Sequence, residues 1–200
     1  MTDSQAFLKN KTPIEVFSEW MEEAKKTPLT LPNAFTLSTI ALDGTPNSRV
    51  LLLKDLLPKG LVFYTNYDSE KGKEIAKNSC VTMNFYWEPL FKQVKWKGTL
   101  NKVSRDDSEK YWVTRPRESQ LSQWVSKQSE PVESREQLDR ELQAAELMFS
   151  NKPVPLPENW GGYLLTPTYV EFWIGRDGRF HDRFTYHKVE NLWRGQRLYP

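Results

Sequence analysis

At 200 residues the chain has the length of one domain, and its 28 basic and 26 acidic side chains leave a formal net charge of +2. That balance excludes a histone-like or ribosomal polyelectrolyte, so any anion-binding site must be local. Aromatic residues reach 13%, which excludes a wholly disordered chain, and no apolar run approaches the roughly 18 residues that a membrane span needs.

The chain opens with residues 1–11, which we expect to be a flexible tail before a single domain at residues 12–200. Thr12, Pro13 and Glu15 form the pattern of a capped helix start, and Thr27-Pro28 ends that helix. Apolar residues then alternate with a period of two, which predicts consecutive antiparallel strands joined by tight turns. The elements predicted next are strands at 34–42, 47–53 and 61–66, a helix from Ser69 to Lys77, and strands at 80–87 and 91–103.

Helices dominate the next part of the chain, with predicted starts at Ser104, Glu118 and Ser134. The third helix is amphipathic, and its predicted inward positions are Leu138, Leu142, Ala145 and Phe149. Alternate prolines at 153–157 then require an extended connector. The last predicted elements are strands at 163–166, 169–174, 179–187 and 192–198. About eight short strands with interposed helices predict a mainly β fold, a β-barrel with added helices.

The most informative spacing is Arg179-Phe180-His181-Asp182-Arg183, because alternate residues of a strand share a face. Three potential cations would then lie together, and if they were partly buried they would call for an anion. A solvated strand face is the alternative that the spacing leaves open.

Other segments offer weaker candidates. Arg49 and Lys54 bracket an apolar run, where strand-end charge is the ordinary interpretation. The helix start at Ser69 is either a phosphate seat with Lys71 or only a cap. Arg115 and Ser119 stand between two helices, where they either bind phosphate or cap the surface. A single cysteine, Cys80, and two histidines predict no metal site and no disulfide, and with no signal peptide a cytoplasmic protein is expected.

A series of segments, in order along the chain, resembles the pyridoxamine (pyridoxine) 5′-phosphate oxidase family. The segments are Arg49 to Lys54 (RVLLLK), Phe63 to Asn66 (FYTN), Lys92 to Val94, Tyr111 with Arg115 to Ser119 (RPRES), Trp124 to Ser129 (WVSKQS), Val154 to Gly162, and Glu171 to Arg183 (EFWIGRDGRFHDR). The spacing of Trp173, Arg179, His181 and Arg183 is the most specific of these features.

The resemblance implies a split β-barrel homodimer that holds FMN in two clefts at the subunit interface. In the family pattern Arg49 and Lys71 attend the FMN phosphate, and Trp173 and Arg183 reach the flavin from the partner chain. The other implied cofactor contacts are Val50, Lys54, Tyr64, Thr65, Gln93, Gln128 and Ser129.

The resemblance also implies the substrate and the reaction. Pyridoxamine 5′-phosphate or pyridoxine 5′-phosphate would be oxidised by O2 to pyridoxal 5′-phosphate with release of hydrogen peroxide, in pyridoxal phosphate biosynthesis or salvage. The implied substrate-phosphate contacts are Lys54, Tyr111, Arg115 and Ser119, with Arg179 and His181 over the pyridine ring as the catalytic pair. The sequence departs from the family pattern at Glu70, where a basic residue is usual, so Glu70→Arg is expected to tighten FMN binding.

Two other interpretations compete with this one. The first is a related flavin protein with another substrate, such as a phenazine-pathway oxidase. The presence together of Arg115, Ser119, Arg179 and His181 argues against it. The second is a single-stranded nucleic-acid platform, because residues 92–117 carry eight basic and three acidic side chains with interleaved aromatic residues. A yellow protein with a flavin spectrum would support the oxidase, and salt-sensitive oligonucleotide binding would support the platform. We expect neither nucleic acid nor membrane as a partner.

Overall fold

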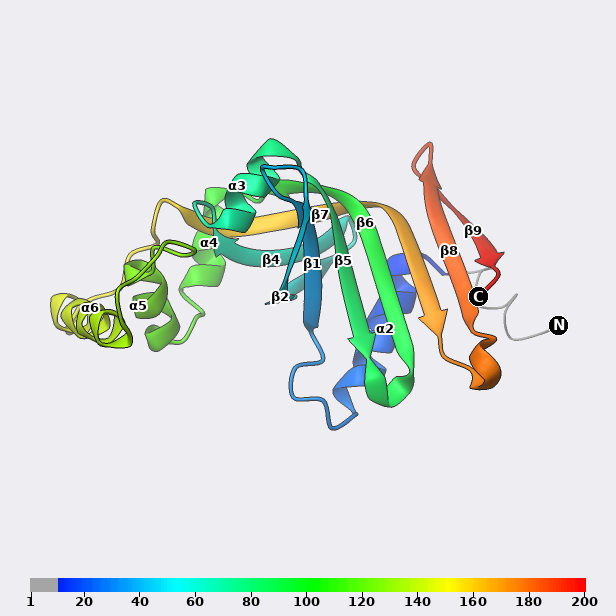
Figure 1. Cartoon of the computed structure of the whole chain (residues 1–200), viewed down its shortest axis with the longest axis horizontal. Helices are drawn as coiled ribbons and strands as arrows, with labels where there is room; N and C mark the ends of the chain where they lie inside the picture. Colours follow the sequence, from blue (N-terminus) through cyan, green and yellow to red (C-terminus); the bar gives the residue numbers. More distant parts are fainter. Residues whose placement is uncertain (1–10) are drawn as a thin grey trace.

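The computed structural model describes residues 11–200, so nearly all of the expected tail lies outside the described residues. The α-helices are α2 (Pro13–Lys25), α3 (Glu70–Lys77), α4 (Arg105–Trp112), α5 (Arg117–Val125) and α6 (Arg135–Met148), with short 3-10 turns at Glu88–Leu90 and Asp177–Arg179. The strands are β1 (Ala34–Ile40), β2 (Pro46–Leu52), β3 (Asp55–Leu57), β4 (Gly60–Asn66), β5 (Cys80–Trp87), β6 (Lys92–Lys102), β7 (Trp160–Ile174), β8 (Asp182–Val189) and β9 (Leu192–Leu198) (Figure 1). A mainly β fold with added helices is confirmed.

All strands of residues 11–200 join one antiparallel sheet in the order β2-β1-β5-β6-β7-β4-β3, with β8 and β9 added beside β7. The expectation that strands 47–53 and 61–66 are neighbours is wrong, because four strands lie between β2 and β4. Burial explains the separation. β4 is buried along nearly its whole length and lies inside the sheet, whereas β2 is half-exposed and forms an edge.

The longest strand, β7, makes the sheet curl. One side of β7 pairs with β6 over its length, whereas the other pairs with β4 as far as Leu165 and with β8 from Tyr169 onward. The predicted break at residues 167–168 is therefore wrong. Pro167 is tolerated because β7 changes partner there and because the register with β6 shifts between Lys97 and Gly98. A Cβ on Gly98 would lie 2.1 Å from the Thr166 carbonyl oxygen, so this irregularity requires glycine.

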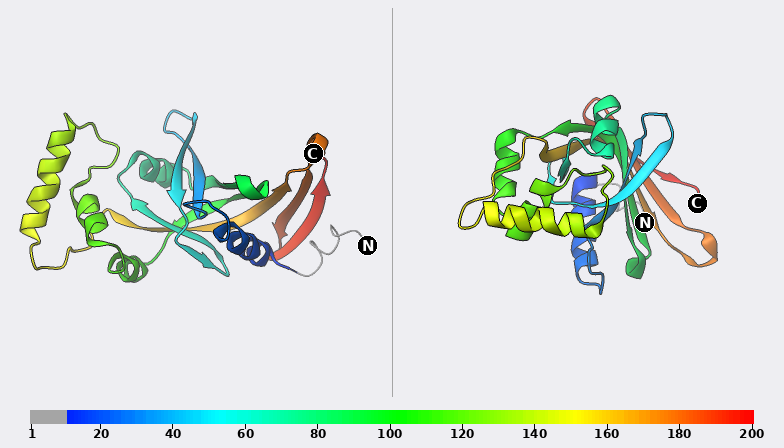
Figure 2. Two further views of the ribbon diagram at one scale, coloured as in Figure 1. Left: turned by 90° about the horizontal axis from the view of Figure 1, so that it is seen from below. Right: turned by 60° about the vertical axis from the view of Figure 1, so that its left-hand side comes forward.

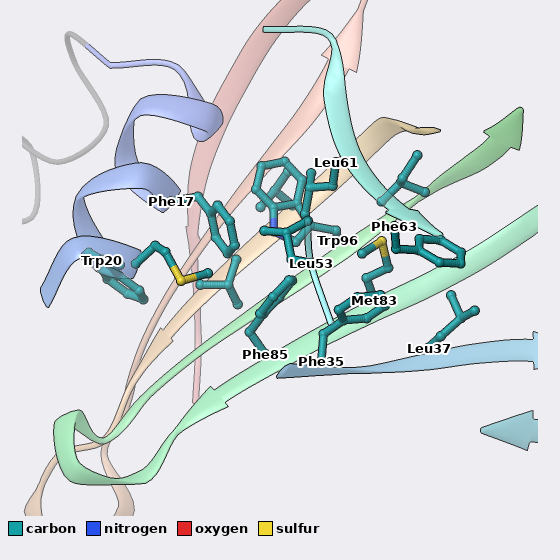
Figure 3. Packing of buried hydrophobic residues seen from close by; sticks show 14 of the residues in the cluster. Phe17, Trp20, Phe35, Leu37, Leu53, Leu61, Phe63, Met83, Phe85 and Trp96 are labelled. Carbon is teal, nitrogen blue, oxygen red and sulfur yellow. The ribbon is translucent and has the colours of Figure 1, made fainter. Parts of the chain in front are cut away.

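Helix α2 covers the concave face of the sheet and closes the main core (Figures 1 and 2). Its start is as predicted: the Thr12 hydroxyl accepts from the Glu15 N–H, and the Glu15 carboxylate accepts from the Thr12 N–H. Phe17 packs against Phe85 and Trp96 with ring centroids 4.9 and 5.3 Å apart (Figure 3). Burial of these large rings on one side of the sheet stabilises its curvature.

Helices α4, α5 and α6 form a second, smaller core with the start of β7. Trp112, Leu121, Ala145, Phe149, Val154 and Trp160 are its buried residues. Leu142 packs against them as expected, but Leu138 is exposed, because the N-terminal turns of α6 extend beyond this core. The longest helix of residues 11–200 has 14 residues, and none of these helices is suited to crossing a bilayer.

The predicted strand from residue 179 begins three residues late. Gly178 and Arg179 have φ angles of 67° and 62°, which no strand accommodates, and β8 starts at Asp182. The turn at 177–179 and the β8–β9 hairpin lie at the opposite end of the long axis from α5 and α6 (Figures 1 and 2).

Candidate active site

Two of the predicted phosphate-binding cations meet where α3 begins. Ser69 caps α3 by accepting from the Gly72 N–H, and its Oγ lies 3.2 Å from the Lys71 Nζ. Lys71 is only 7% exposed. Burial, followed by the positive charge of Arg49, lowers the pKa of Lys71. A buried lysine near an arginine at a helix N-terminus is an arrangement suited to an anion.

The buried carboxylate of Glu74 holds the Arg49 guanidinium in place. Its Nη2 atom lies 2.8 Å from the Glu74 Oε2, and the Thr39 hydroxyl and Asn47 amide also donate to Glu74. Burial would raise the pKa of Glu74, but these hydrogen bonds and the charge of Arg49 outweigh it, so the pKa is lowered. Glu74 therefore stays ionised and ties α3 to the β1–β2 hairpin.

The loop after α5 reaches the same region. Thr65 is buried on β4, and its hydroxyl lies 3.5 Å from the Gln128 Oε1. Ser129 has a φ of 75°, in the left-handed region, which turns the chain directly after Gln128. A cavity of about 680 Å³ lies between this loop and α3 and is lined by Gln128, Ser129, Glu70 and Lys73, among others. Val50, in contrast, is exposed on the edge strand β2.

Lys54 lines a different cavity from the one beside α3. Because β2 ends at Leu52, Lys54 lies in the short connection to β3 and is free of strand alternation. It lines a cavity of about 590 Å³ together with Tyr64 and Tyr111. Lys54 and Tyr111, both predicted to contact the substrate phosphate, are therefore brought together from the β2–β3 connection and α4, beside Tyr64 of β4, a predicted cofactor contact.

The stacked rings of Tyr64, Tyr111 and Trp160 form an aromatic ladder at the wall of this cavity, and the Arg115 guanidinium lies against it. The Tyr64 ring stacks on Tyr111 at 4.0 Å and on Trp160 at 5.4 Å. The Arg115 guanidinium lies 4.6 Å from the Trp160 ring centroid and donates to the Ser119 carbonyl at 3.1 Å. A Cβ on Gly162 would lie 2.8 Å from the Tyr64 Cε1, so glycine leaves the room that this ladder needs.

Arg115 keeps an uncompensated charge. Burial lowers the pKa of Arg115. Its guanidinium donates to a backbone carbonyl, and it forms no ion pair with a carboxylate of residues 11–200. A half-buried guanidinium on ring faces is available to an anionic ligand.

Three residues expected to contact the flavin form a row across β6, β7 and β8. The register places Gln93 of β6 opposite Trp173 of β7, and Trp173 opposite Arg183 of β8, so the three share one face. The ring of His181 lies 4.6 Å from that of Trp173. Arg183 also pairs with Glu171 of β7 at 2.8 Å.

The predicted strand-face alternation of Arg179, His181 and Arg183 is wrong, although the residues remain near one another. Arg179 belongs to the exposed 3-10 turn, and the His181 Nδ1 accepts from the Arg176 N–H at 3.1 Å. Only Arg183 lies within β8. The left-handed conformation at Gly178 and Arg179 replaces the expected extended chain.

Within one chain these groups do not all meet. The turn with Arg179 lies beyond β8, at one end of the long axis, and α5 with Ser119 lies at the other (Figures 1 and 2). In this structure the two groups therefore do not form a single site within one chain.

The structure removes much of the support for a nucleic-acid platform. Trp96 and Trp112 are buried, so they offer no ring faces for stacking with bases. Arg105 donates to the carbonyls of Trp160, Leu156 and Pro157, and Arg117 to those of Phe149 and Lys152. These arginines brace the chain around α4 and α5.

Sequence reasoning missed Glu74, Trp160 and Glu171 as supports of the site. Glu74 follows Lys71 by three residues and therefore shares its helix face, which is a signal that helical periodicity provides. Trp160 and Glu171 lie inside segments already singled out, but which groups they touch depends on strand register.

Sequence comparison assigns both parts of the chain. The family described as pyridoxamine 5′-phosphate oxidase matches residues 21–149, and the pyridoxine 5′-phosphate oxidase C-terminal dimerisation region matches residues 160–200. A pyridoxine/pyridoxamine 5′-phosphate oxidase of Rubrobacter xylanophilus is 47% identical over 94% of this chain and 87% of its own. One of Leptospira biflexa is 43% identical over 94% of this chain and 89% of its own.

Solved structures share the fold. PhzG from Burkholderia lata, in complex with tetrahydrophenazine-1-carboxylic acid, superposes with a TM-score of 0.90 at 26% identity, over 96% of this chain and 94% of its own. An FMN-binding protein related to pyridoxamine 5′-phosphate oxidase from Nostoc punctiforme gives a TM-score of 0.76 at 20% identity, over 96% of this chain and all of its own. The split-barrel fold is thereby confirmed.

Proposed function

Because the chain belongs to the pyridoxamine 5′-phosphate oxidase family, we propose that it oxidises pyridoxamine 5′-phosphate or pyridoxine 5′-phosphate to pyridoxal 5′-phosphate with FMN as its cofactor. The observation that carries the proposal is Arg115, a half-buried guanidinium beside the cavity of Lys54 and Tyr111 that pairs with no carboxylate in the described part of the chain, residues 11–200. A small phosphate ester supplies the negative charge that this site lacks.

The residues at α3 fit the phosphate of FMN. Arg49 and Lys71 are two cations close enough to affect each other, and Lys71 is buried with a lowered pKa. A phosphate dianion between them would offset their repulsion and the cost of burying Lys71. Thr65, Gln128 and Ser129 lie near one another and would contact the rest of the cofactor, with Tyr64 and Lys54 toward the substrate. Val50, next to Arg49 on β2, would reach the cofactor from the edge strand.

The substrate phosphate would be held by Lys54, Tyr111, Arg115 and Ser119. The aromatic ladder fixes Tyr111 and Arg115 before binding, so little side-chain freedom is lost when the phosphate arrives. A planar pyridine ring is a suitable partner for a site walled by stacked rings.

A second copy of the chain would complete each site. The turn at Asp177–Arg179 and β8 lie at the other end of the long axis from α5 (Figure 1). We therefore assign Arg179, His181 and Arg183 to the cleft of the partner chain, with Trp173 and Gln93 from the same row. The match of residues 160–200 to a dimerisation region supports a homodimer with FMN at the interface.

In the proposed reaction FMN, held by Arg49, Lys71 and the loop of Gln128, would supply the two-electron redox chemistry that couples oxidation of the substrate carbon to reduction of O2 to H2O2. For the amine, one water enters and ammonia leaves; for the alcohol, the aldehyde forms directly. The chain's own residues orient the ring and exclude water: the phosphate contacts fix one end, while Arg179 and His181 orient and polarise the other end.

The likeness to PhzG keeps a phenazine-pathway relative as the second candidate. The higher identity to the Rubrobacter and Leptospira oxidases supports the phosphate ester as substrate instead.

Peroxide release tests the proposal directly. We expect FMN-loaded protein to form peroxide and aldehyde in equal amounts from pyridoxamine 5′-phosphate, pyridoxine 5′-phosphate or both, and Arg179→Ala to lose most of this activity. If the FMN-loaded protein turns over neither ester, the proposed substrate is wrong.

A further inference from the structure

A buried carboxylate lies beside the residues expected to meet the flavin. Glu171 of β7 stands opposite Lys95 of β6 and Thr185 of β8, and its side chain is only 4% exposed. Carboxylates are rarely buried so deeply unless charged or polar partners surround them.

Both carboxylate oxygens of Glu171 are engaged. The Oε1 atom accepts from the Nε of Arg183 at 2.8 Å and lies 2.8 Å from its Nη2. The Oε2 atom lies 2.8 Å from the Lys95 Nζ and accepts from the Tyr169 hydroxyl at 2.8 Å. Burial alone would raise the pKa of Glu171, but these partners lower it, so the group stays ionised.

These contacts fix Arg183 along one edge of its guanidinium. Its Nη1 atom also donates to the Tyr199 carbonyl at 3.1 Å. Residues 11–200 therefore use three of the five N–H groups and leave two for a ligand. An arginine held in this way has less freedom to lose when a ligand binds.

Stability alone does not explain the cluster. A buried ion pair contributes little, because removing two charges from water offsets most of their attraction, and apolar replacements are often neutral. The cluster instead adjoins the row of Gln93, Trp173 and Arg183 on the same sheet face, since Glu171 and Trp173 are two residues apart on β7. Its two cations exceed its one carboxylate, so positive charge remains on this face.

We propose that Glu171 is a positioning residue for the cofactor, which holds the Arg183 guanidinium in the orientation that meets the flavin, while Lys95 balances the second carboxylate oxygen. The inference rests on the proposed function, because it takes FMN as the ligand of Arg183. Glu171 acts through Arg183 and touches no cofactor itself.

A double-mutant cycle on FMN affinity tests this role. Full-length protein freed of flavin is titrated with FMN, and quenching of flavin fluorescence gives Kd for the wild type, Glu171→Gln, Arg183→Ala and the double variant. We expect each single change to raise Kd about tenfold and the double variant to be no weaker than Arg183→Ala, because Glu171 has nothing left to position. Independent roles would give about a hundredfold.

Tyr169→Phe is the matched control. The Tyr169 hydroxyl donates to the Oε2 of Glu171, whereas Arg183 is held by Oε1, and the ring contacts of Tyr169 are kept in phenylalanine, so the change should leave Kd within about twofold. Melting temperatures of the flavin-free proteins show which variants fold, and if Glu171→Gln does not, Glu171→Asp takes its place in the cycle. Additive losses, or an unchanged Kd in the Glu171 variant, overturn the inference. A wild type that binds no FMN overturns the proposed function as well.

Discussion

Arg49 and Arg115 are both expected to bind phosphate, but the chain holds them in opposite ways. Arg49 rests on the ionised carboxylate of Glu74, whereas Arg115 rests on the ring of Trp160. A carboxylate neutralises the cation that it fixes, and an aromatic ring does not. Arg115 therefore presents its full charge, and at the other site Lys71 supplies the positive charge that Glu74 removes.

Removal of Arg115 should therefore weaken binding of the phosphate end of the substrate more than it slows the chemical step. We expect Arg115→Ala to raise KM about 10- to 100-fold, since a charge-assisted contact is worth roughly 1.5–3 kcal/mol, with a smaller change in kcat. Arg115→Lys should lie between, because lysine lacks the planar fork that stacks on Trp160.

Steady-state kinetics on both esters check this expectation. Arg140→Ala, which removes an exposed arginine of α6, is the control for a lost positive charge and should leave KM unchanged. Equal KM values for Arg115→Ala and the wild type would remove Arg115 from the substrate site.

The lowered pKa of Lys71 predicts how FMN affinity depends on pH. Lysine loses its charge above its pKa, so affinity should fall as pH rises through a range below the ordinary lysine value of about 10.4. In that range the unfolded chain binds more protons than the flavin-free fold, so the stability of the flavin-free protein should rise with pH. Affinity and stability should thus change in opposite directions.

Titrations of FMN between about pH 7 and pH 10 measure the first trend, and urea unfolding of the flavin-free protein measures the second. Lys71→Met should bind FMN more weakly at every pH and flatten both curves. If the variant keeps the pH dependence of the wild type, the titrating group is not Lys71.

At the level of elements, the start of α3 places Lys71 near Arg49, the two cations expected to bind the FMN phosphate. The first residue of α3, Glu70, is acidic and would repel that phosphate. Glu70 is exposed beside Lys71 and lines the cavity of Gln128. We expect Glu70→Arg to lower the Kd for FMN about threefold to tenfold, because it replaces a repulsive charge with an attractive one in partly screened surroundings. Loss of an acidic residue at a helix start should cost about 0.3–1 kcal/mol of stability.

Fluorescence titration of FMN measures this change. Glu146→Arg on the exposed side of α6 makes the same charge change in another element and should not alter Kd. An unchanged or higher Kd in Glu70→Arg would show that residue 70 lies away from the phosphate.

The elements that sequence predicts well are those whose ends are set by local chemistry. Thr12, Ser69, Ser104 and Ser134 each accept a backbone N–H at the helix start that their positions indicate. Pro167 misled the strand prediction, because tolerance of a proline depends on which strands flank β7. The turn at Gly178 and Arg179 also gave no local signal strong enough to outweigh the apparent alternation of the cations after it.

The residues of the candidate site also separate into those whose proximity was expected and those found only in the structure. Lys71 with Arg49, and Lys54 with Tyr111, meet as the resemblance implies. Helical periodicity places Glu74 beside Lys71, but its pairing with Arg49 joins residues 25 positions apart, and the pairing of Glu171 with Arg183 joins residues 12 positions apart. These long-range contacts depend on strand register and packing, which no spacing rule captures.

At the scale of the whole molecule, the elongated shape separates two halves of the proposed site. Substitutions at opposite ends should therefore complement each other in mixed dimers. Arg115→Ala would damage one half of every site in its homodimer, and a combined Arg179→Ala and His181→Ala chain the other half. A mixed dimer would contain one doubly damaged site and one intact site.

At substrate concentrations far below the raised KM of Arg115→Ala, where its sites are nearly inactive, coexpression of the two chains should restore about a quarter of the wild-type activity. About half of randomly assembled dimers are mixed, and each of these has one intact site out of two. Peroxide release per bound FMN in the unfractionated pool gives this number directly, and mixed dimers isolated with two different affinity tags should reach about half of the wild-type value. Coexpression of Arg115→Ala with Ser119→Ala, two changes at the same end, should restore nothing, because every site then keeps a lesion. If the first pair also restores nothing although mixed dimers form, Arg115 and His181 act within one chain, and the site would have to close by a rearrangement of the ends rather than by assembly.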